Sequence, residues 1–189
     1  MRTIAIILLF LPVGMLAQNK KTGKTGWRSI TGAGFVAGES GVKPVFQLSG
    51  GIKYNRYFTG IGLGYDSYQF DAFSLFADWR MSFGKKQLLF AYATPGYAIP
   101  EKYKSHGEDF RKDRMKGGFY MDAGFGYRIP ISILHRLSFS AGYIRKSVSH
   151  KIKYIYPCGT PCVEIPPTIY VNRFKYGLIT TRLSWELGK

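Results

Sequence analysis

The chain has 189 residues, enough for one domain, and its 27 Lys and Arg against 11 Asp and Glu give a formal net charge of +16. Such a basic chain often binds nucleic acid, but the export signal predicted below argues against this partner. Anionic phosphate at a membrane surface is the simpler counter-charge, and a solvated basic surface without a partner is the alternative.

The N-terminus has the three parts of a secretory signal peptide. Met1-Arg2-Thr3 is charged, residues 4–11 are apolar but too few to span a bilayer, and the small residue Ala17 precedes the expected cleavage point. A buried N-terminal helix is the alternative interpretation. Beyond Ala17 no run of about 18 apolar residues occurs, so we expect no transmembrane helix. We predict a signal peptide over residues 1–17, a polar periplasmic lead over 18–26 and one domain over 27–189.

Strict alternation of residue types continues along the predicted domain and is clearest in residues 57–65. Side chains of a strand point alternately to opposite faces. One face is apolar with a tyrosine at each end and the other is nearly bare: Tyr57, Thr59, Ile61, Leu63 and Tyr65 against Phe58, Gly60, Gly62 and Gly64. This pattern is typical of a barrel strand that turns its apolar face to lipid and keeps small groups inside.

Eight segments of this kind can be placed in chain order. They cover residues 27–38, 44–54, 57–65, 72–83, 87–97, 117–129, 137–150 and 173–187. The faces of the first are ambiguous, because Ile30 and Val36 lie opposite the outward set. In the fifth, Pro95 cannot donate to a ladder and predicts a bulge or the end of regular pairing.

The connections support a barrel. Residues 99–116 and 151–172 are the two long connections, the fifth and the seventh, whereas the second and fourth are tight. With a periplasmic N-terminus both long connections lie outside the cell, as in bacterial barrels with an even number of strands. We therefore predict an all-β fold, an eight-stranded antiparallel up-and-down transmembrane β-barrel in the outer membrane.

The predicted inward face carries charges of both signs. An apolar sandwich core would not tolerate them, but the narrow lumen of an eight-stranded barrel can hold them as ion pairs. We predict a plugged polar lumen with a structural ion network, and a proton or ion path is the alternative. The predicted members are Lys53, Asp78, Arg80, Asp122, Arg128, Arg182 and Glu186.

With these features, residues 27–189 resemble the small eight-stranded outer-membrane barrels of OmpA and OmpX type. The abundance of glycine and tyrosine resembles the outer membrane protein beta-barrel domain proteins of Bacteroidota-like bacteria. The C-terminus departs from this pattern, since such proteins often end on an aromatic residue and this chain ends Trp185-Glu-Leu-Gly-Lys189.

Other candidate sites lie in the long connections. Cys158 and Cys162 are predicted to form a disulfide in an oxidising compartment, with a redox or metal role as the alternative. A cluster of four basic residues near the outer rim is predicted to contact lipopolysaccharide phosphates, or else to be a solvated strand end. Its members are Arg145, Lys146, Lys151 and Lys153.

Catalysis is the alternative to a structural role. A lipid A acylase or acyltransferase would need a histidine with a serine and an acid near the lipid face. His106 and His135 lie in connections, and Ser147 and Ser149 point away from the face of His150. We therefore expect no catalytic residue, cofactor or metal.

The predicted role is structural, or an interaction through the long loops, including as a subunit of a larger outer-membrane complex. The expected partners are outer-membrane lipid, lipopolysaccharide and other proteins of such a complex, without nucleic acid. An OmpW-like conduit for small apolar molecules would need an apolar lumen, which the charged inward set opposes. A soluble exported β-protein is the last alternative.

Overall fold

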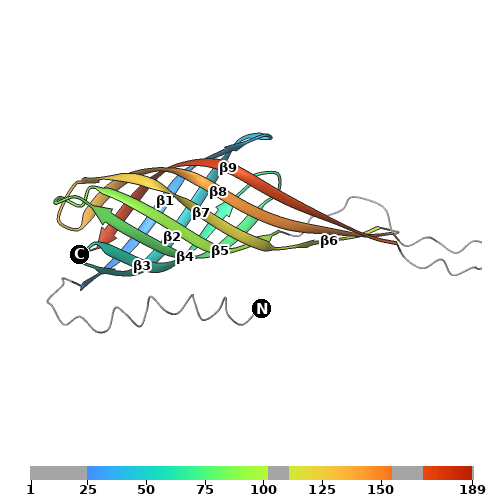
Figure 1. Ribbon diagram of the computed structural model, residues 1–189, viewed down its shortest axis with the longest axis horizontal. Helices are drawn as coiled ribbons and strands as arrows, with labels where there is room; N and C mark the ends of the chain where they lie inside the picture. Colours follow the sequence, from blue (N-terminus) through green and yellow to red (C-terminus); the bar gives the residue numbers. More distant parts are fainter. Residues whose placement is uncertain (1–24, 102–110, 155–167, 189) are drawn as a thin grey trace, which may run out of the picture.

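In the computed structural model, strands build one closed antiparallel barrel (Figure 1). The structure describes residues 25–101, 111–154 and 168–188. Among these residues no helix is long and apolar enough to cross a membrane. The strands are β1 Thr25–Gly38, β2 Gly41–Tyr54, β3 Tyr57–Asp66, β4 Ala72–Phe83, β5 Leu89–Pro100, β6 Arg111–Lys116, β7 Gly118–Pro130, β8 His135–Tyr154 and β9 Thr168–Gly188.

The barrel has eight positions, because β6 and β7 are two parts of one barrel strand. Both pair with β8, and Gly117 separates them. With β6 and β7 counted as one, every barrel strand pairs with the next along the chain, and β1 pairs with β9 from Arg28↔Gly188 to Ala37↔Ile179, which closes the ring. The predicted eight-stranded up-and-down barrel is confirmed.

The alternation places large apolar side chains outside, whereas the inward face holds the charged residues together with a smaller apolar set. Ile61 and Phe125 are each 73% exposed, whereas Asp78 and Asp122 are fully buried. The first strand follows the same rule: Phe35 is exposed and Ile30 is buried. The predicted outward faces are therefore correct for most strands, including the ambiguous one, but in β5 the aromatic Phe90 and Tyr92 point into the barrel.

The bare inward face of β3 has a packing reason. A Cβ at Gly62 would lie 2.5 Å from Cε2 of Phe76, whose ring comes from the neighbouring strand β4. Glycine leaves the space that this inward ring occupies. In a narrow barrel, a bare face on one strand and a large side chain on the next together fill the interior.

Pro95 does not interrupt the fifth strand, so the predicted bulge is wrong. Pro95 is opposite Met121 of β7, and β5 continues to Pro100. Toward β4 the register is the same on both sides, with pairs Phe76↔Gly96 and Trp79↔Ala93. The missing N–H therefore leaves a short gap in one ladder rather than shifting it.

The long connections contain more strand than the sequence suggested. β6 occupies residues 111–116, β8 extends to Tyr154 and β9 begins at Thr168, all within segments predicted as loops. These three strands extend past one end of the barrel (Figure 1). We call β6, residues 147–154 of β8 and residues 168–177 of β9 the arm. These segments were predicted as loops because they are rich in charged residues. A strand outside lipid needs no apolar face, so the alternation used to recognise the other strands is not enforced there.

Candidate functional site

The inner half of the lumen, near the end where β1 begins and β9 ends, is organised around Glu186 of β9. Its carboxylate pairs with Arg28 of β1 at 3.0 Å, Arg128 of β7 at 2.9 Å and Arg80 of β4 at 3.6 Å. Arg128 also donates to Ser82 Oγ at 2.6 Å. Three guanidinium groups from three strands thus share one buried carboxylate, and Arg28 and Arg128 depend on it for compensation.

Two further ion pairs fill the middle of the lumen. Asp78 pairs with Arg80 at 2.9 Å and accepts a hydrogen bond from Ser49 at 2.7 Å. Asp122 pairs with Arg182 at 2.6 Å. A cavity between Arg80 and Arg182 measures about 10 Å³, room for about one water molecule.

Aromatic rings complete this network. The Tyr92 hydroxyl donates to Asp122 at 3.0 Å, and the Arg182 guanidinium lies 4.9 Å from the centre of the Tyr92 ring. The Arg128 guanidinium lies 4.2 Å from the centre of the Phe90 ring. Such contacts stabilise the weakly hydrated guanidinium groups away from water.

Six of the seven residues predicted for the lumen network meet in this way. The seventh, Lys53, is half-buried near the inner end and, in the described part of the chain, forms no ion pair with the others. Sequence reasoning missed Arg28, which is 1% exposed. The signal was present, because Arg28 alternates in step with the buried Ile30.

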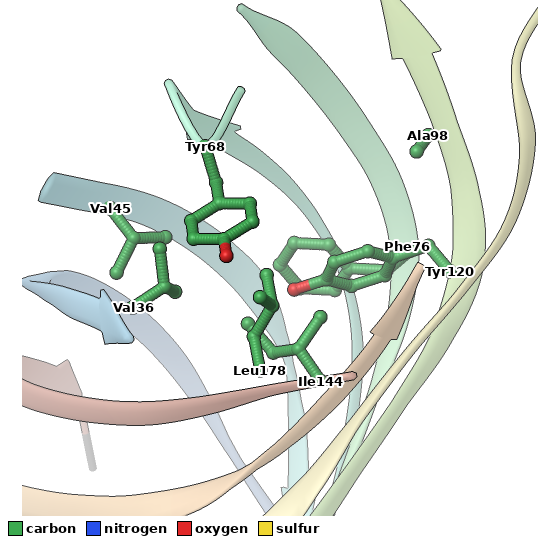
Figure 2. Packing of buried hydrophobic residues seen from close by; sticks show 8 residues of the cluster. All are labelled: Val36, Val45, Tyr68, Phe76, Ala98, Tyr120, Ile144 and Leu178. Atoms are coloured by element: carbon green, nitrogen blue, oxygen red, sulfur yellow. The ribbon is translucent and has the colours of Figure 1, made fainter. Parts of the chain in front are cut away.

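The outer half of the lumen is apolar. Figure 2 shows the side chains of several strands meeting there, with the ring of Tyr68 entering from the turn after β3. The Tyr68 hydroxyl accepts a hydrogen bond from the Ser40 backbone N–H at 2.8 Å, so the two outer turns are tied together over the mouth. The cluster contains Val36, Val45, Tyr68, Phe76, Ala98, Tyr120, Ile144 and Leu178.

One ion pair lies in this apolar half. Lys146 of β8 is fully buried and pairs with Asp66 of β3 at 2.5 Å, with the Phe70 ring centre 5.4 Å from its ammonium. The predicted lipopolysaccharide contact by Lys146 is therefore wrong. Alternation along β8 puts Lys146 on the inward face with Ser138 and Ser140, which would have revealed its position.

The other three residues of the predicted basic cluster are not shown to be buried in the lumen. Arg145 is exposed on the outward face of β8. Lys151 and Lys153 lie in β8 opposite Val171 and Ile169 of β9, but their side chains lie outside the described part of the structure. The lipopolysaccharide contact of these three residues stays a prediction.

Cys158, Cys162 and His106 lie outside the described residues. His135 begins β8, and its Nδ1 accepts a hydrogen bond from Trp185 Nε1 at 3.2 Å. His150 is half-buried and lies opposite Asn172 of β9. The contact of His135 with an outward tryptophan fits a structural role for this histidine.

The outer wall carries a broad apolar band. Its hollow of about 530 Å³ crosses β1, where small residues such as Thr31 and Ala33 lie between the larger Phe46 and Leu183. A contiguous apolar surface of this extent is unusual for a soluble monomer and indicates contact with another apolar phase. Exposed members from five strands include Leu48, Ile61, Leu75, Phe125 and Ile179.

No family model and no curated protein matches the sequence. Solved structures do resemble the fold. The outer membrane protein AlkL in lipid bilayers is similar over 92% of this chain and 94% of its own, with 9% identity and a TM-score of 0.52. The outer membrane protein OprG from Pseudomonas aeruginosa is similar over 91% and 98%, with 7% identity and a TM-score of 0.52. At such identities the likeness shows the fold, and both structural neighbours are outer membrane proteins.

Proposed function

We propose that the chain is an integral outer-membrane barrel with a sealed lumen, which acts as a structural or interaction protein through its outer end. The observation that carries this proposal is the inverted distribution of side chains. Large apolar residues such as Ile61 and Phe125 face outward, whereas Asp78, Asp122 and Glu186 are buried inside. In water this arrangement would leave the apolar band exposed, whereas in a bilayer the band contacts acyl chains and the charged groups are kept away from lipid.

The outer membrane is supported as the location by two independent features. The N-terminal residues carry the parts of a signal peptide, and a closed barrel is the route by which strands span a bilayer. OprG and AlkL, which share the fold, are described as outer membrane proteins. We further propose that the barrel is of the OmpA and OmpX type.

Membrane fractionation tests the location. After an alkaline wash the protein is expected to stay in the outer-membrane pellet, because its apolar band is in contact with acyl chains. Release into the supernatant would contradict the proposal and favour a soluble exported β-protein.

The sealed lumen is supported by the ion pairs of the inner half and the cavity of only about 10 Å³ between Arg80 and Arg182. Purified protein in planar lipid bilayers is expected to show no steady conductance. The double variant Arg80→Ala/Arg182→Ala removes the side chains on both sides of that cavity. We expect it to show stepwise ion currents, because water can then fill the lumen. Steady current from the unmodified protein would contradict the sealed lumen.

A conduit for small apolar molecules is the second candidate, and the apolar outer half of the lumen favours it. Against it, the path would have to continue through the buried carboxylates and guanidinium groups of the inner half. Uptake of a fluorescent apolar dye into proteoliposomes compares the two. Dye flux above that of protein-free liposomes would favour the conduit.

We propose no enzymatic activity. The Trp185 contact gives the His135 imidazole a structural partner, and that histidine lies at the inner end of the barrel. Mass spectrometry of lipid A from a deletion strain tests this. A change of lipid A acylation in the deletion strain would support a lipid A-modifying enzyme instead, if the intact gene restores the normal acylation and a His150→Ala variant does not.

A further inference from the structure

The outer part of β9 has a strand neighbour on one side within the described residues. Its pairing with β1 ends at Ala37↔Ile179, whereas its pairing with β8 continues to Tyr154↔Thr168. Along residues 171–177 the edge that faces away from β8 therefore has no described strand beside it. An edge of this kind presents a row of backbone N–H and C=O groups that another extended chain can pair with.

Residues 171–175 are also exposed on both faces, whereas Tyr176 is half-buried and packs against Tyr68 and Phe70 of the turn after β3. Within the barrel β9 alternates between exposed and buried side chains, but residues 171–175 are all exposed, with Val171 at 46% and Phe174 at 38%. A ribbon of few strands with two open faces gains little stability from burial. An added strand would satisfy the edge and cover part of both faces.

The arm is strongly basic, which determines the kind of chain that fits. Its three segments (β6, residues 147–154 and residues 168–177) hold eight Lys and Arg residues and one acidic residue, Asp113. Two copies of the arm would repel each other, so self-pairing is unfavourable. The basic residues are Arg111, Lys112, Arg114, Lys116, Lys151, Lys153, Arg173 and Lys175.

The two faces of β9 at this edge differ in a regular way. Arg173 and Lys175 share one face, and Phe174 and Tyr176 share the other, where their rings lie parallel with centres 6.3 Å apart. A partner strand that alternates acidic and apolar residues would place acids beside the cations and apolar groups beside the rings. Cross-strand pairs of both kinds stabilise a sheet.

We propose that residues 171–177 of β9 bind an extended, acidic segment of a partner protein, which joins the arm as an additional strand. Backbone pairing supplies general affinity and the alternating side chains supply selectivity. Anionic lipid could neutralise the charge of the arm but has no row of amides to match the edge. The inference rests on the proposed function in one respect, that the arm lies on the outer side of the membrane.

The experiment uses the full chain in lipid nanodiscs and a labelled ten-residue peptide of alternating Glu and Val. Fluorescence anisotropy is expected to show saturable binding, and hydrogen exchange is expected to show new protection at residues 171–177. A peptide of alternating Lys and Val is expected to bind at least about tenfold more weakly, which corresponds to about 1.4 kcal/mol.

The double variant Arg173→Glu/Lys175→Glu reverses the charge at the edge without changing the backbone. It is expected to lose at least about tenfold in affinity for the Glu/Val peptide and to gain affinity for the Lys/Val peptide. Lys85→Glu/Lys86→Glu is the matched control, because it makes the same change of charge in an exposed turn at the opposite end. The control is expected to bind like the unmodified protein.

Three results would overturn the proposal. The first is an equal loss of peptide affinity in the control and in the edge variant. The second is peptide binding without new hydrogen-exchange protection in β9. The third is protection of β9 without peptide, in a protein that sediments as a dimer. If the protein binds lipopolysaccharide vesicles while β9 stays unprotected from hydrogen exchange, the basic arm binds anionic lipid instead of a partner strand, which also contradicts the proposal. Alkaline extraction of the same preparation separates the two ideas: a protein that stays in the membrane but binds no peptide contradicts the edge alone.

Discussion

The two halves of the barrel interior fill the same narrow space with opposite chemistry. In the inner half, Glu186 compensates three arginines, whereas in the outer half aliphatic and aromatic side chains surround Tyr68 and Phe76 (Figure 2). A charged network is stable only when every member has its partner. An apolar cluster loses stability in proportion to the volume removed. The halves should therefore respond differently to single substitutions.

The largest expected loss is at the centre of the inner half. Glu186→Gln keeps the size of the side chain but leaves Arg28, Arg80 and Arg128 without their shared carboxylate. We expect it to lower the free energy of unfolding by about 3–5 kcal/mol, measured by urea titration in lipid vesicles. Glu101→Gln, at an exposed carboxyl, is the control and should stay within about 0.5 kcal/mol. A loss below about 1 kcal/mol for Glu186→Gln would remove the contrast between the halves.

The buried ion pair of the outer half, Lys146 with Asp66, should behave like the charged network of the inner half. Lys146→Met leaves Asp66 buried without its cation and should cost about 3 kcal/mol in the same titration. Adding Asp66→Asn removes the uncompensated charge and keeps an acceptor for the Tyr68 N–H. The double variant should return to within about 1 kcal/mol of the unmodified protein. If the double variant is no more stable than the single one, the apolar surroundings of this pair do not explain its behaviour.

A purely apolar change should cost less. Leu178→Ala in the outer cluster is expected to lose about 2 kcal/mol, at the low end for leucine because the cluster adjoins the mouth and can relax. Leu183→Ala on the outward face of the same strand is the matched control. Lipid fills the space that it leaves, so its loss should be smaller. Equal losses would show that the outer half is not packed like a core.

The smallest effect is expected at the mouth. Tyr68→Phe keeps the ring in the cluster but removes the hydroxyl that accepts the Ser40 N–H. The loss should be about 1 kcal/mol, and hydrogen exchange at Ser40 should become faster. Unchanged exchange at Ser40 would show that this hydrogen bond does not hold the two turns together.

Alternation was enough to predict the barrel, because lipid outside and a crowded lumen inside make the two faces of each strand chemically distinct. It also placed Asp78, Arg80, Asp122 and Glu186 correctly inside. It could not show that Glu186 meets Arg28, since the first and last strands become neighbours only when the ring closes. Lys146 was predicted at the outer rim from its basic neighbours, although its position in the alternation of β8 places it inside.

The arm could not be predicted for a different reason. Before Leu178, β9 lies outside the barrel, and its residues 171–175 are exposed on both faces. Because both faces are exposed, burial does not enforce alternation here. The short alternation of Arg173 and Lys175 with Phe174 lies among charged residues that resemble a loop in the sequence. Pro95 shows the converse, since a residue that usually ends a strand is accommodated where both neighbouring strands hold the register on either side.

Closure of the ring between β1 and β9 has a consequence for the order of assembly. Glu186 lies on β9, whereas Arg28 lies on β1 and Arg128 on β7. Before β9 docks, these guanidinium groups must stay in contact with water or headgroups. Pairing of β9 with β1 and β8 therefore closes the ring and also supplies the carboxylate that compensates Arg28 and Arg128.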